Sequence, residues 1–179
     1  MAGSSLPATL AGGRYVLGEP LGQGGSAVVV RARDERLGVD RAVKILAQVP
    51  DSVRATMRRR LQAEARTMAR LHHPHVLTVH DVGRDGDLDY VVMDFAPGGS
   101  VGDALDRRGW LPVDEAVDDV VQVLSALEAA HAAGVVHRDV KPGNLLLDAA
   151  GRVLLADFGV ALIAGEDRRT RAGAAIGSF

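Results

Sequence analysis

The spacing of apolar residues predicts that the first part of the chain consists of short strands. Apolar runs at 15–21, 27–33 and 41–47 are separated by glycines or polar residues. Two further runs, 76–82 and 88–95, flank a polar turn at 84–87 that contains Gly86. Short runs joined by Gly and Asp turns are typical of antiparallel hairpins. We therefore expect a small antiparallel sheet before residue 96.

Two longer segments carry helical spacing of apolar residues. Residues 51–71 contain neither Gly nor Pro, and residues 111–133 begin with Pro112 and an acidic turn and end before Gly134. Both ends of the second segment suit a helix. Between the predicted sheet and this helix, Pro-Gly-Gly-Ser at 97–100 predicts a hinge between two lobes. The apolar stripe of the second helix is Val117, Val120, Val121, Leu124 and Leu127.

Composition narrows the class of protein. The chain has 179 residues, 47% hydrophobic and 25% charged, so a globular core is expected. The net charge of −2 gives no global field toward nucleic acid or a membrane surface. The absence of cysteine excludes disulfides and fits a reducing cytoplasm. The most apolar stretch, 153–164, is short and contains Asp157, so no membrane-spanning segment is predicted.

A glycine-rich sequence, Gly-Gln-Gly-Gly-Ser-Ala at 22–27, lies between the first two predicted strands. Such glycines let backbone N–H groups approach phosphate oxygens without an intervening Cβ. They are equally explained as ordinary turn residues. No helix follows directly, so the sequence matches neither a Rossmann fingerprint nor a P-loop.

Lys44 lies in the third predicted strand, within Ala-Val-Lys at 42–44. It is either a solvated lysine at a strand edge or a lysine aimed under the glycine loop at phosphates. The second role needs a carboxylate to hold the side chain, and Glu64 in the first predicted helix is the candidate. Considered alone, Glu64 is an ordinary exposed helix residue.

The sequence His-Arg-Asp-Val-Lys-Pro-Gly-Asn at 137–144 combines the residue types that phosphoryl transfer needs. Asp139 can accept the proton of an incoming hydroxyl group. Lys141 can neutralise charge on the transferred phosphoryl group, and the amide oxygen of Asn144 suits Mg²⁺. Asp157, in Asp-Phe-Gly at 157–159, follows thirteen residues after Asn144 and is the main candidate ligand for Mg²⁺. The order and spacing of these motifs together indicate one site.

Together these motifs resemble the protein kinase family, in particular the bacterial serine/threonine kinases of eukaryotic type, over residues 14–179. The resemblance implies an α+β, protein-kinase-like two-lobe fold. It implies a flexible N-terminus at 1–13 and an ATP-binding small lobe at 14–95 with an antiparallel sheet and the αC helix. It implies an incomplete helical large lobe at 96–179, with the catalytic loop and the start of the activation segment.

The resemblance also implies roles for the motif residues. Asp139 would be the catalytic base with Lys141 beside it, while Lys44 would contact the α- and β-phosphates of ATP. Glu64 would pair with Lys44. The implied metal ligands are Asn144 and Asp157, binding Mg²⁺. A column of Met68, Val79, His137 and Phe158 would mark the active state.

For the nucleotide itself, the resemblance implies that Met93 is the gatekeeper and that the backbone of 94–96 hydrogen-bonds adenine. Plain core packing is the alternative explanation for the apolar members of the site. The implied nucleotide-binding residues are Leu21, Gly22, Gln23, Gly24, Gly25, Ser26, Ala27, Val29, Ala42, Lys44, Met93, Asp94, Phe95, Ala96 and Leu146. Ala27 stands where the family usually has a third glycine.

The implied function is ATP-dependent phosphorylation of Ser/Thr hydroxyls on proteins, and Lys141 points to the serine/threonine branch. Because the chain ends within the activation segment, two alternatives stay open: a truncated, catalytically weak nucleotide-binding or scaffold module, and a fragment of a longer kinase. The expected ligands are ATP, Mg²⁺ and protein substrates, without nucleic acid, and dimerisation is left open. The expected location is the cytoplasm, with any membrane anchor beyond residue 179.

Other clusters have simpler explanations. His72, His73, His75 and His80 could suggest zinc, but the turn at Pro74 gives them no common face. Arg58, Arg59 and Arg60 are expected on a solvated helix face, with a partner surface left open. Thr170 is the best candidate phosphosite, with Arg138 available to pair with its phosphate. Exposure of the apolar stripe would make the 179-residue chain poorly stable and weakly active alone.

Overall fold

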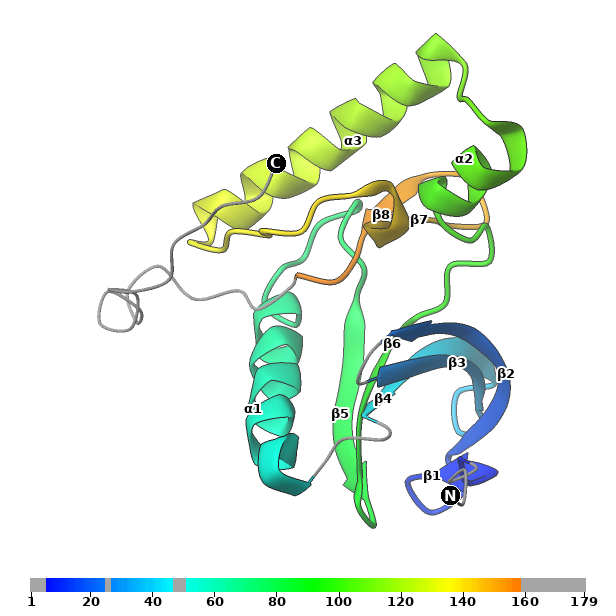
Figure 1. Cartoon of the computed structure of the whole chain (residues 1–179), viewed down its shortest axis with the longest axis vertical. Coiled ribbons are helices and arrows are strands. Elements are labelled where there is room, and N and C mark those ends of the chain that lie inside the picture. Colours follow the sequence, from blue (N-terminus) through cyan, green and yellow to red (C-terminus); the bar gives the residue numbers. More distant parts are fainter. Residues whose placement is uncertain (1–5, 25–26, 47–50, 159–179) are drawn as a thin grey trace.

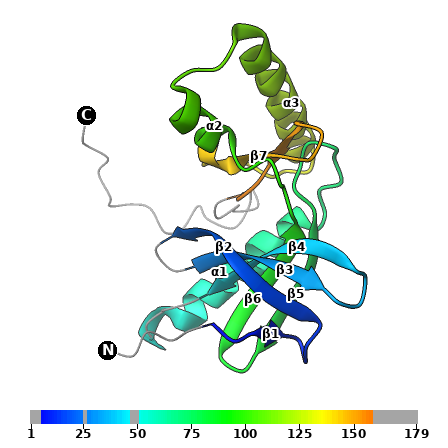
Figure 2. The same ribbon diagram turned by 90° about the vertical axis from the view of Figure 1, so that its right-hand side faces the viewer.

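The computed structural model describes residues 6–24, 27–46 and 51–158. They form two lobes (Figures 1 and 2): a sheet with helix α1 (Asp51–Met68) at one end, and helices α2 (Val101–Arg108) and α3 (Val113–Ala132) at the other. This arrangement confirms the expected α+β, protein-kinase-like fold, with an antiparallel sheet lobe and few helices in the second lobe.

The small lobe is a six-stranded antiparallel sheet in the order β1-β2-β3-β4-β6-β5. Alternation along the strands sorts its side chains to two faces. In β4, Val43 and Ile45 are fully buried in one cluster with Tyr15, whereas Ala42 joins a second cluster shared with the other lobe. The strands are β1 (Thr9–Leu10), β2 (Tyr15–Gly24), β3 (Ala27–Asp34), β4 (Val39–Leu46), β5 (Val79–Asp85) and β6 (Leu88–Asp94).

Part of the predicted N-terminal segment at 1–13 contacts the sheet, although most of its described residues are exposed. Leu10 is fully buried in the cluster that contains Tyr15, and the Ala11 N–H donates to Asp85 Oδ2 at 2.7 Å. A two-residue strand followed by two glycines is too short to show alternation, so its docking is visible only in three dimensions. Residues 1–5 lie outside the described part.

Helix α1 packs on the β5 and β6 end of the sheet, as Figure 1 shows. Its residues Leu61 and Ala65 are buried against Leu46 of β4 and Val91 of β6. The buried apolar side chains of α1 therefore face the sheet, as expected for an amphipathic helix.

The second lobe contains the long helix α3, the short helix α2 and the hairpin of β7 (Leu145–Leu147) with β8 (Val153–Leu155). Helix α2 is absent from the sequence-based prediction, which treats 97–100 only as a hinge. Its signal is a capping box: the Ser100 hydroxyl accepts the Asp103 N–H, and the Asp103 carboxylate accepts the Ser100 N–H. Gly109 in the left-handed region closes its other end.

The two lobes share one apolar cluster. Ala42 and Met93 from the sheet lie in it with Ala126 of α3 and with Phe158, which is fully buried. Backbone bonds reinforce this junction: Leu77 N donates to Leu155 O at 3.1 Å, and Leu155 N donates to His75 O at 2.9 Å. The site residues therefore lie between lobes that share one core.

Candidate active site

The glycine-rich loop lies where the sequence predicts it, between β2 and β3. The two strands pair up to Gly24 and Ala27, with Val29 opposite Gly22. Leu21 and Gly22 are exposed, so this end of the hairpin is accessible. Gly25 and Ser26 lie outside the described residues, as do the side-chain surroundings of Gln23.

The predicted adenine-binding side chains come together from both lobes. Ala42 of β4 is paired with Met93 of β6, and both belong to the shared apolar cluster. Val29 of β3 and Leu146 of β7 pack against the same cluster. These four residues, far apart in sequence, therefore line one apolar region at the junction of the lobes.

The segment after the hinge is held on β7 by close backbone contact. Gly98 N donates to Leu147 O at 3.0 Å, and Leu147 N donates to Gly99 O at 2.8 Å. A Cβ on Gly98 would lie only 2.7 Å from Leu147 Cβ and 2.8 Å from Leu147 O, so only glycine fits here. The sequence pattern predicts Gly98 only as part of a hinge between two lobes, because this contact joins residues that are distant in the chain.

The catalytic loop brings Asp139, Lys141 and Asn144 into direct contact. Lys141 Nζ donates to Asp139 Oδ2 at 2.8 Å, and Asn144 Nδ2 donates to the same oxygen at 3.0 Å. The Lys141 ammonium and the Asn144 amide lower the pKa of the Asp139 carboxyl below its ordinary value. About half of the Asp139 side chain is exposed, so an ionised carboxylate is presented to solvent.

A short 3-10 helix at Pro142–Asn144 sets the geometry of this loop. Asn144 is buried, and its Nδ2 also donates to the Asp139 carbonyl at 2.8 Å. The neighbouring α2 approaches closely: a Cβ on Gly102 would lie 3.1 Å from Gly143 N. The sequence pattern did not single out Gly102, because its tight contact is with another glycine across the fold.

Asp157 follows β8 and pairs with Lys44. Lys44 Nζ donates to Asp157 Oδ1 at 2.8 Å, which links β4 to the segment after β8. Asp157 and Arg138 are non-glycine residues with left-handed backbone, at φ 53° and 67°. This conformation costs free energy for residues with a Cβ, and in folded proteins such strain clusters at functional sites.

His137 hydrogen-bonds both the loop that contains Asp139 and the segment that contains Asp157. It is 2% exposed, its ring lies 4.6 Å from the ring of Phe158, and its Nε2 donates to Ala156 O at 2.9 Å. Burial lowers the pKa of His137, which keeps the imidazole neutral. Met68 and Phe158 belong to the shared apolar cluster, and Val79 packs against it. Of the four residues predicted to form a column, His137 and Phe158 are thus in ring contact, and Met68 and Val79 belong to or pack on the cluster that contains Phe158.

The oxygen-bearing residues present fit a divalent metal ion. Ala156 N donates to Asn144 O at 2.9 Å, so Asn144 and Asp157 lie on adjoining segments. Because the Asn144 amide nitrogen is engaged with Asp139, its side-chain oxygen is the atom left for a cation. Within residues 6–24, 27–46 and 51–158, no group of three or more His, Cys, Asp or Glu side chains could hold a metal. A pair of oxygen ligands that shares the ion with phosphates suits Mg²⁺.

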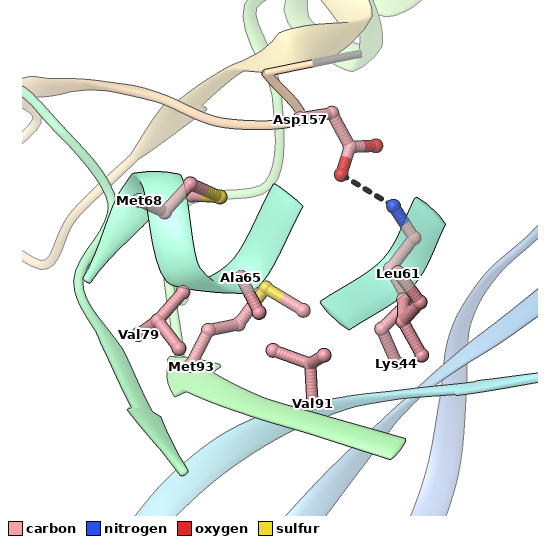
Figure 3. Close-up of a pocket in the computed structure, with 8 residues that line it drawn as sticks. All are labelled: Lys44, Leu61, Ala65, Met68, Val79, Val91, Met93 and Asp157. Atoms are coloured by element: carbon pink, nitrogen blue, oxygen red, sulfur yellow. Dashed lines mark hydrogen bonds and ion pairs between the residues drawn. The ribbon is translucent and has the colours of Figure 1, made fainter. Parts of the chain in front are cut away.

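A small, mostly apolar cavity lies behind Met93, between α1 and the sheet (Figure 3). Lys44 and Asp157 stand at one side of it, and Leu61, Ala65 and Val91 line the rest with three further apolar residues. The Lys44–Asp157 ion pair thus lies at the boundary between this apolar space and the site. The side chain of Glu64, the predicted partner of Lys44, lies outside the described part.

The histidines that could suggest a zinc site lie in the described part of the chain. His73 Nε2 lies 3.2 Å from Ser125 Oγ, His75 Nδ1 lies 3.0 Å from Val153 O, and His80 pairs with Asp94. His73, His75 and His80 thus have separate protein partners. Thr170 and the rest of 159–179 lie outside the described part. Among the helices described, none is long and apolar enough to cross a membrane.

The fold and this constellation define a protein kinase domain. The family model described as the protein kinase domain matches residues 15–175, and the chain belongs to that family.

Curated relatives refine the class. The chain is 43% identical over 154 residues to the serine/threonine-protein kinase PknA of Mycobacterium tuberculosis, covering 83% of this chain and 36% of the relative. It is 39% identical over 150 residues to a "Probable serine/threonine-protein kinase" of Clostridium perfringens, covering 84% of this chain and 22% of the relative. The chain is also 38% identical over 164 residues to a "Probable serine/threonine-protein kinase" of Streptomyces coelicolor, covering 89% of this chain and 24% of the relative. The chain thus spans well under half the length of each of these relatives.

Proposed function

We propose that this chain carries out ATP-dependent phosphorylation of Ser and Thr hydroxyls on proteins. The observation that carries the proposal is the contact of Lys141 and Asn144 with one carboxylate oxygen of Asp139, next to Asp157 and Lys44. Phosphoryl transfer depends mainly on positioning and charge stabilisation, and this arrangement supplies both. The names of the relatives support the choice of Ser/Thr hydroxyls.

Each residue has a defined task in this proposal. Asp139 accepts the proton of the substrate hydroxyl, and its pKa, lowered by Lys141, keeps it ionised. Lys141 offsets negative charge on the phosphoryl group. Lys44 binds the α- and β-phosphates and pairs with Glu64. The apolar region of Val29, Ala42, Met93 and Leu146 holds adenine against the backbone of 94–96, under the loop 21–27.

The proposed metal is Mg²⁺, held by Asn144 and Asp157. When bound, the ion neutralises phosphate charge and orients the transferred group. Lys44 Nζ donates to Asp157 Oδ1, so the proposed phosphate-binding lysine and the proposed metal ligand lie in direct contact. The proposed division places the ATP-binding lobe at 14–95 and the catalytic-loop lobe from 96 onward, and the proposed location is the cytoplasm.

Calorimetric titration with ATP, with and without Mg²⁺, tests the site. We expect binding that needs Mg²⁺ and that weakens at least tenfold in Lys44→Ala and Asp157→Ala, because each substitution removes a charge-assisted contact of about 1.5–3 kcal/mol. Asp139→Asn should bind ATP as the unaltered protein does while losing phosphotransfer to protein substrates. Binding that ignores both Mg²⁺ and Lys44→Ala would contradict the site assignment, and equal loss of binding and turnover in Asp139→Asn would show that Asp139 is structural.

A further inference from the structure

Two consecutive residues at the start of the hinge have side chains held from the sheet. Asp94 is the cross-strand partner of Arg41 in β4, and Arg41 Nη1 donates to Asp94 Oδ1 at 2.9 Å. The Arg41 side chain is only 15% exposed, so water screens this ion pair poorly. His80 Nε2 lies 2.5 Å from the same Asp94 oxygen. Asp94 is therefore fixed by two strands, β4 and β5.

Phe95, the next hinge residue, is held by a different arginine. The guanidinium carbon of Arg31, on β3, lies 5.0 Å from the centre of the Phe95 ring, within the range of a cation–π contact. Arg31 is itself fixed, because its guanidinium donates to Asp40 at 2.7 Å and to Glu19 at 3.0 Å. These carboxylates raise the pKa of Arg31, with Asp40 the larger cause. A pre-ordered guanidinium thus covers the hinge aromatic ring.

A purely stabilising role explains Arg41 poorly. Its Nε is buried and has no hydrogen-bond partner in the described part of the chain. A buried unpaired donor costs free energy, and replacing a partly buried ion pair by apolar residues is often neutral for stability. The buried, unpaired Nε of Arg41 therefore points to a role in placing Asp94 rather than in stabilising the fold.

We propose that Arg41 and Arg31 are positioning residues for adenine recognition, acting through Asp94 and Phe95. This inference rests on the proposed function, in which the backbone of 94–96 meets adenine. The hinge is fixed at its far end by the Gly98–Leu147 bonds and at its near end by these two arginines. With both ends fixed, the backbone groups between them keep the spacing that the adenine edge requires.

The test compares nucleotide affinities of Arg41→Met and Arg31→Met with those of Arg33→Met. Arg33 is a matched control because it lies on β3 and pairs with Asp40 as Arg31 does, while within the described residues it has no hydrogen bond or ring contact with the hinge. Dissociation constants for Mg²⁺-ATP and Mg²⁺-GTP are measured by calorimetry, with a melting temperature for each protein. GTP carries the same phosphates, but its base has a different hydrogen-bonding edge, so it separates base recognition from phosphate binding.

We expect Arg41→Met and Arg31→Met to weaken ATP binding by roughly three- to tenfold, the range in which remote residues modulate a site. GTP binding should change less, so the preference for ATP over GTP shrinks. Arg41→Lys, which keeps the charge beside Asp94, should recover part of the preference, and Arg33→Met should leave it unchanged. If Arg41→Met does not fold, Arg41→Lys and Arg31→Met still allow the ATP and GTP affinities to be compared with those of Arg33→Met. Arg31 is more exposed than Arg41, so its substitution disturbs the fold less.

The outcomes separate the two proposals. An unaltered protein that binds neither nucleotide would overturn the proposed function and this inference with it. An unaltered protein that prefers ATP, with variants whose preference is the same, would overturn the inference alone. Equal weakening of ATP and GTP together with a lower melting temperature would show that the arginines only stabilise the lobe, which also overturns it.

Discussion

Asp139 illustrates how two neighbours adjust a single carboxylate. Lys141 and Asn144 both donate to its Oδ2, and Lys141 is the larger cause of its lowered pKa. In the described part of the chain both contacts use this one oxygen, which leaves Oδ1 to meet a substrate hydroxyl. In the proposed function, the same lysine would thus keep the base ionised and orient it.

Lys141→Met tests this assignment through the pH dependence of kcat/KM. A base with a lowered pKa stays ionised into more acidic solution, and activity falls only as the pH drops through that lowered pKa. Removing the lysine should move the acid limb of the profile to higher pH as well as lowering the rate. Lys141→Arg, which keeps the positive charge, should leave the acid limb near its original position. An acid limb that Lys141→Met does not move would mean that another group sets it.

At the scale of elements, the short helix α2 depends on its N-terminal cap. The Ser100 hydroxyl accepts the Asp103 N–H at 3.0 Å and donates to Asp103 Oδ2 at 2.7 Å. The Ser100 hydroxyl and then its backbone N–H lower the pKa of Asp103. The backbone of Ser100 also forms an isolated antiparallel β-bridge with Leu146 of β7, so the cap adjoins the proposed adenine region.

Ser100→Ala should lower the free energy of unfolding by about 0.5–2 kcal/mol, the usual cost of losing such a cap. Because the pKa of Asp103 is lowered in the folded state, its contribution is present above its unfolded pKa and is lost as the pH falls through the folded pKa. The difference between variant and unaltered protein should therefore shrink in acid. Urea unfolding at neutral and acidic pH measures it.

Ser125→Ala, on the exposed side of α3, is the control for this substitution, because it removes only an exposed hydroxyl contact with His73 and no helix cap. It should change stability by no more than about 0.5 kcal/mol, as is usual for surface sites. If the two serine variants unfolded alike, the cap would contribute nothing measurable to the fold.

At the scale of the whole molecule, one face of α3 exposes a row of apolar side chains. Val117, Val120, Val121 and Leu124 are 54%, 56%, 59% and 59% exposed, whereas Leu127 of the same predicted stripe packs against the core. The expectation of an exposed apolar stripe thus holds for four of its five residues. Contiguous apolar surface of this kind favours association.

The pair of substitutions Val120→Glu and Leu124→Lys tests that consequence on the 179-residue chain. The two positions are one helical turn apart, so the new side chains can pair, and net charge is unchanged. We expect less concentration-dependent association by size-exclusion chromatography with light scattering, and stability within about 0.5 kcal/mol. Val123→Ala, at a buried position on α3, should instead lower the melting temperature without reducing association. Undiminished association in the paired variant would place the contact elsewhere.

The sequence by itself determined the elements and the order of the motifs. The apolar run at 41–47 and the helical spacing in 51–71 and 111–133 are local properties, so they predicted β4, α1 and α3 to within a few residues. The spacing of Asp139, Lys141, Asn144 and Asp157 likewise indicated one kind of chemistry before any geometry was known. Local pattern is enough where the chain's own neighbours fix the backbone.

Only the tertiary structure decided which distant residues meet. Leu10 buried beside Tyr15, Gly98 pressed against Leu147, and Arg31 over Phe95 are contacts between segments whose own sequences give no sign of the partner. Helix α2 was missed for a related reason: eight residues after a Pro-Gly-Gly break are too short for a clear period. Such contacts depend on how strands and lobes pack, because their favourable free energy arises only when separated segments are brought together.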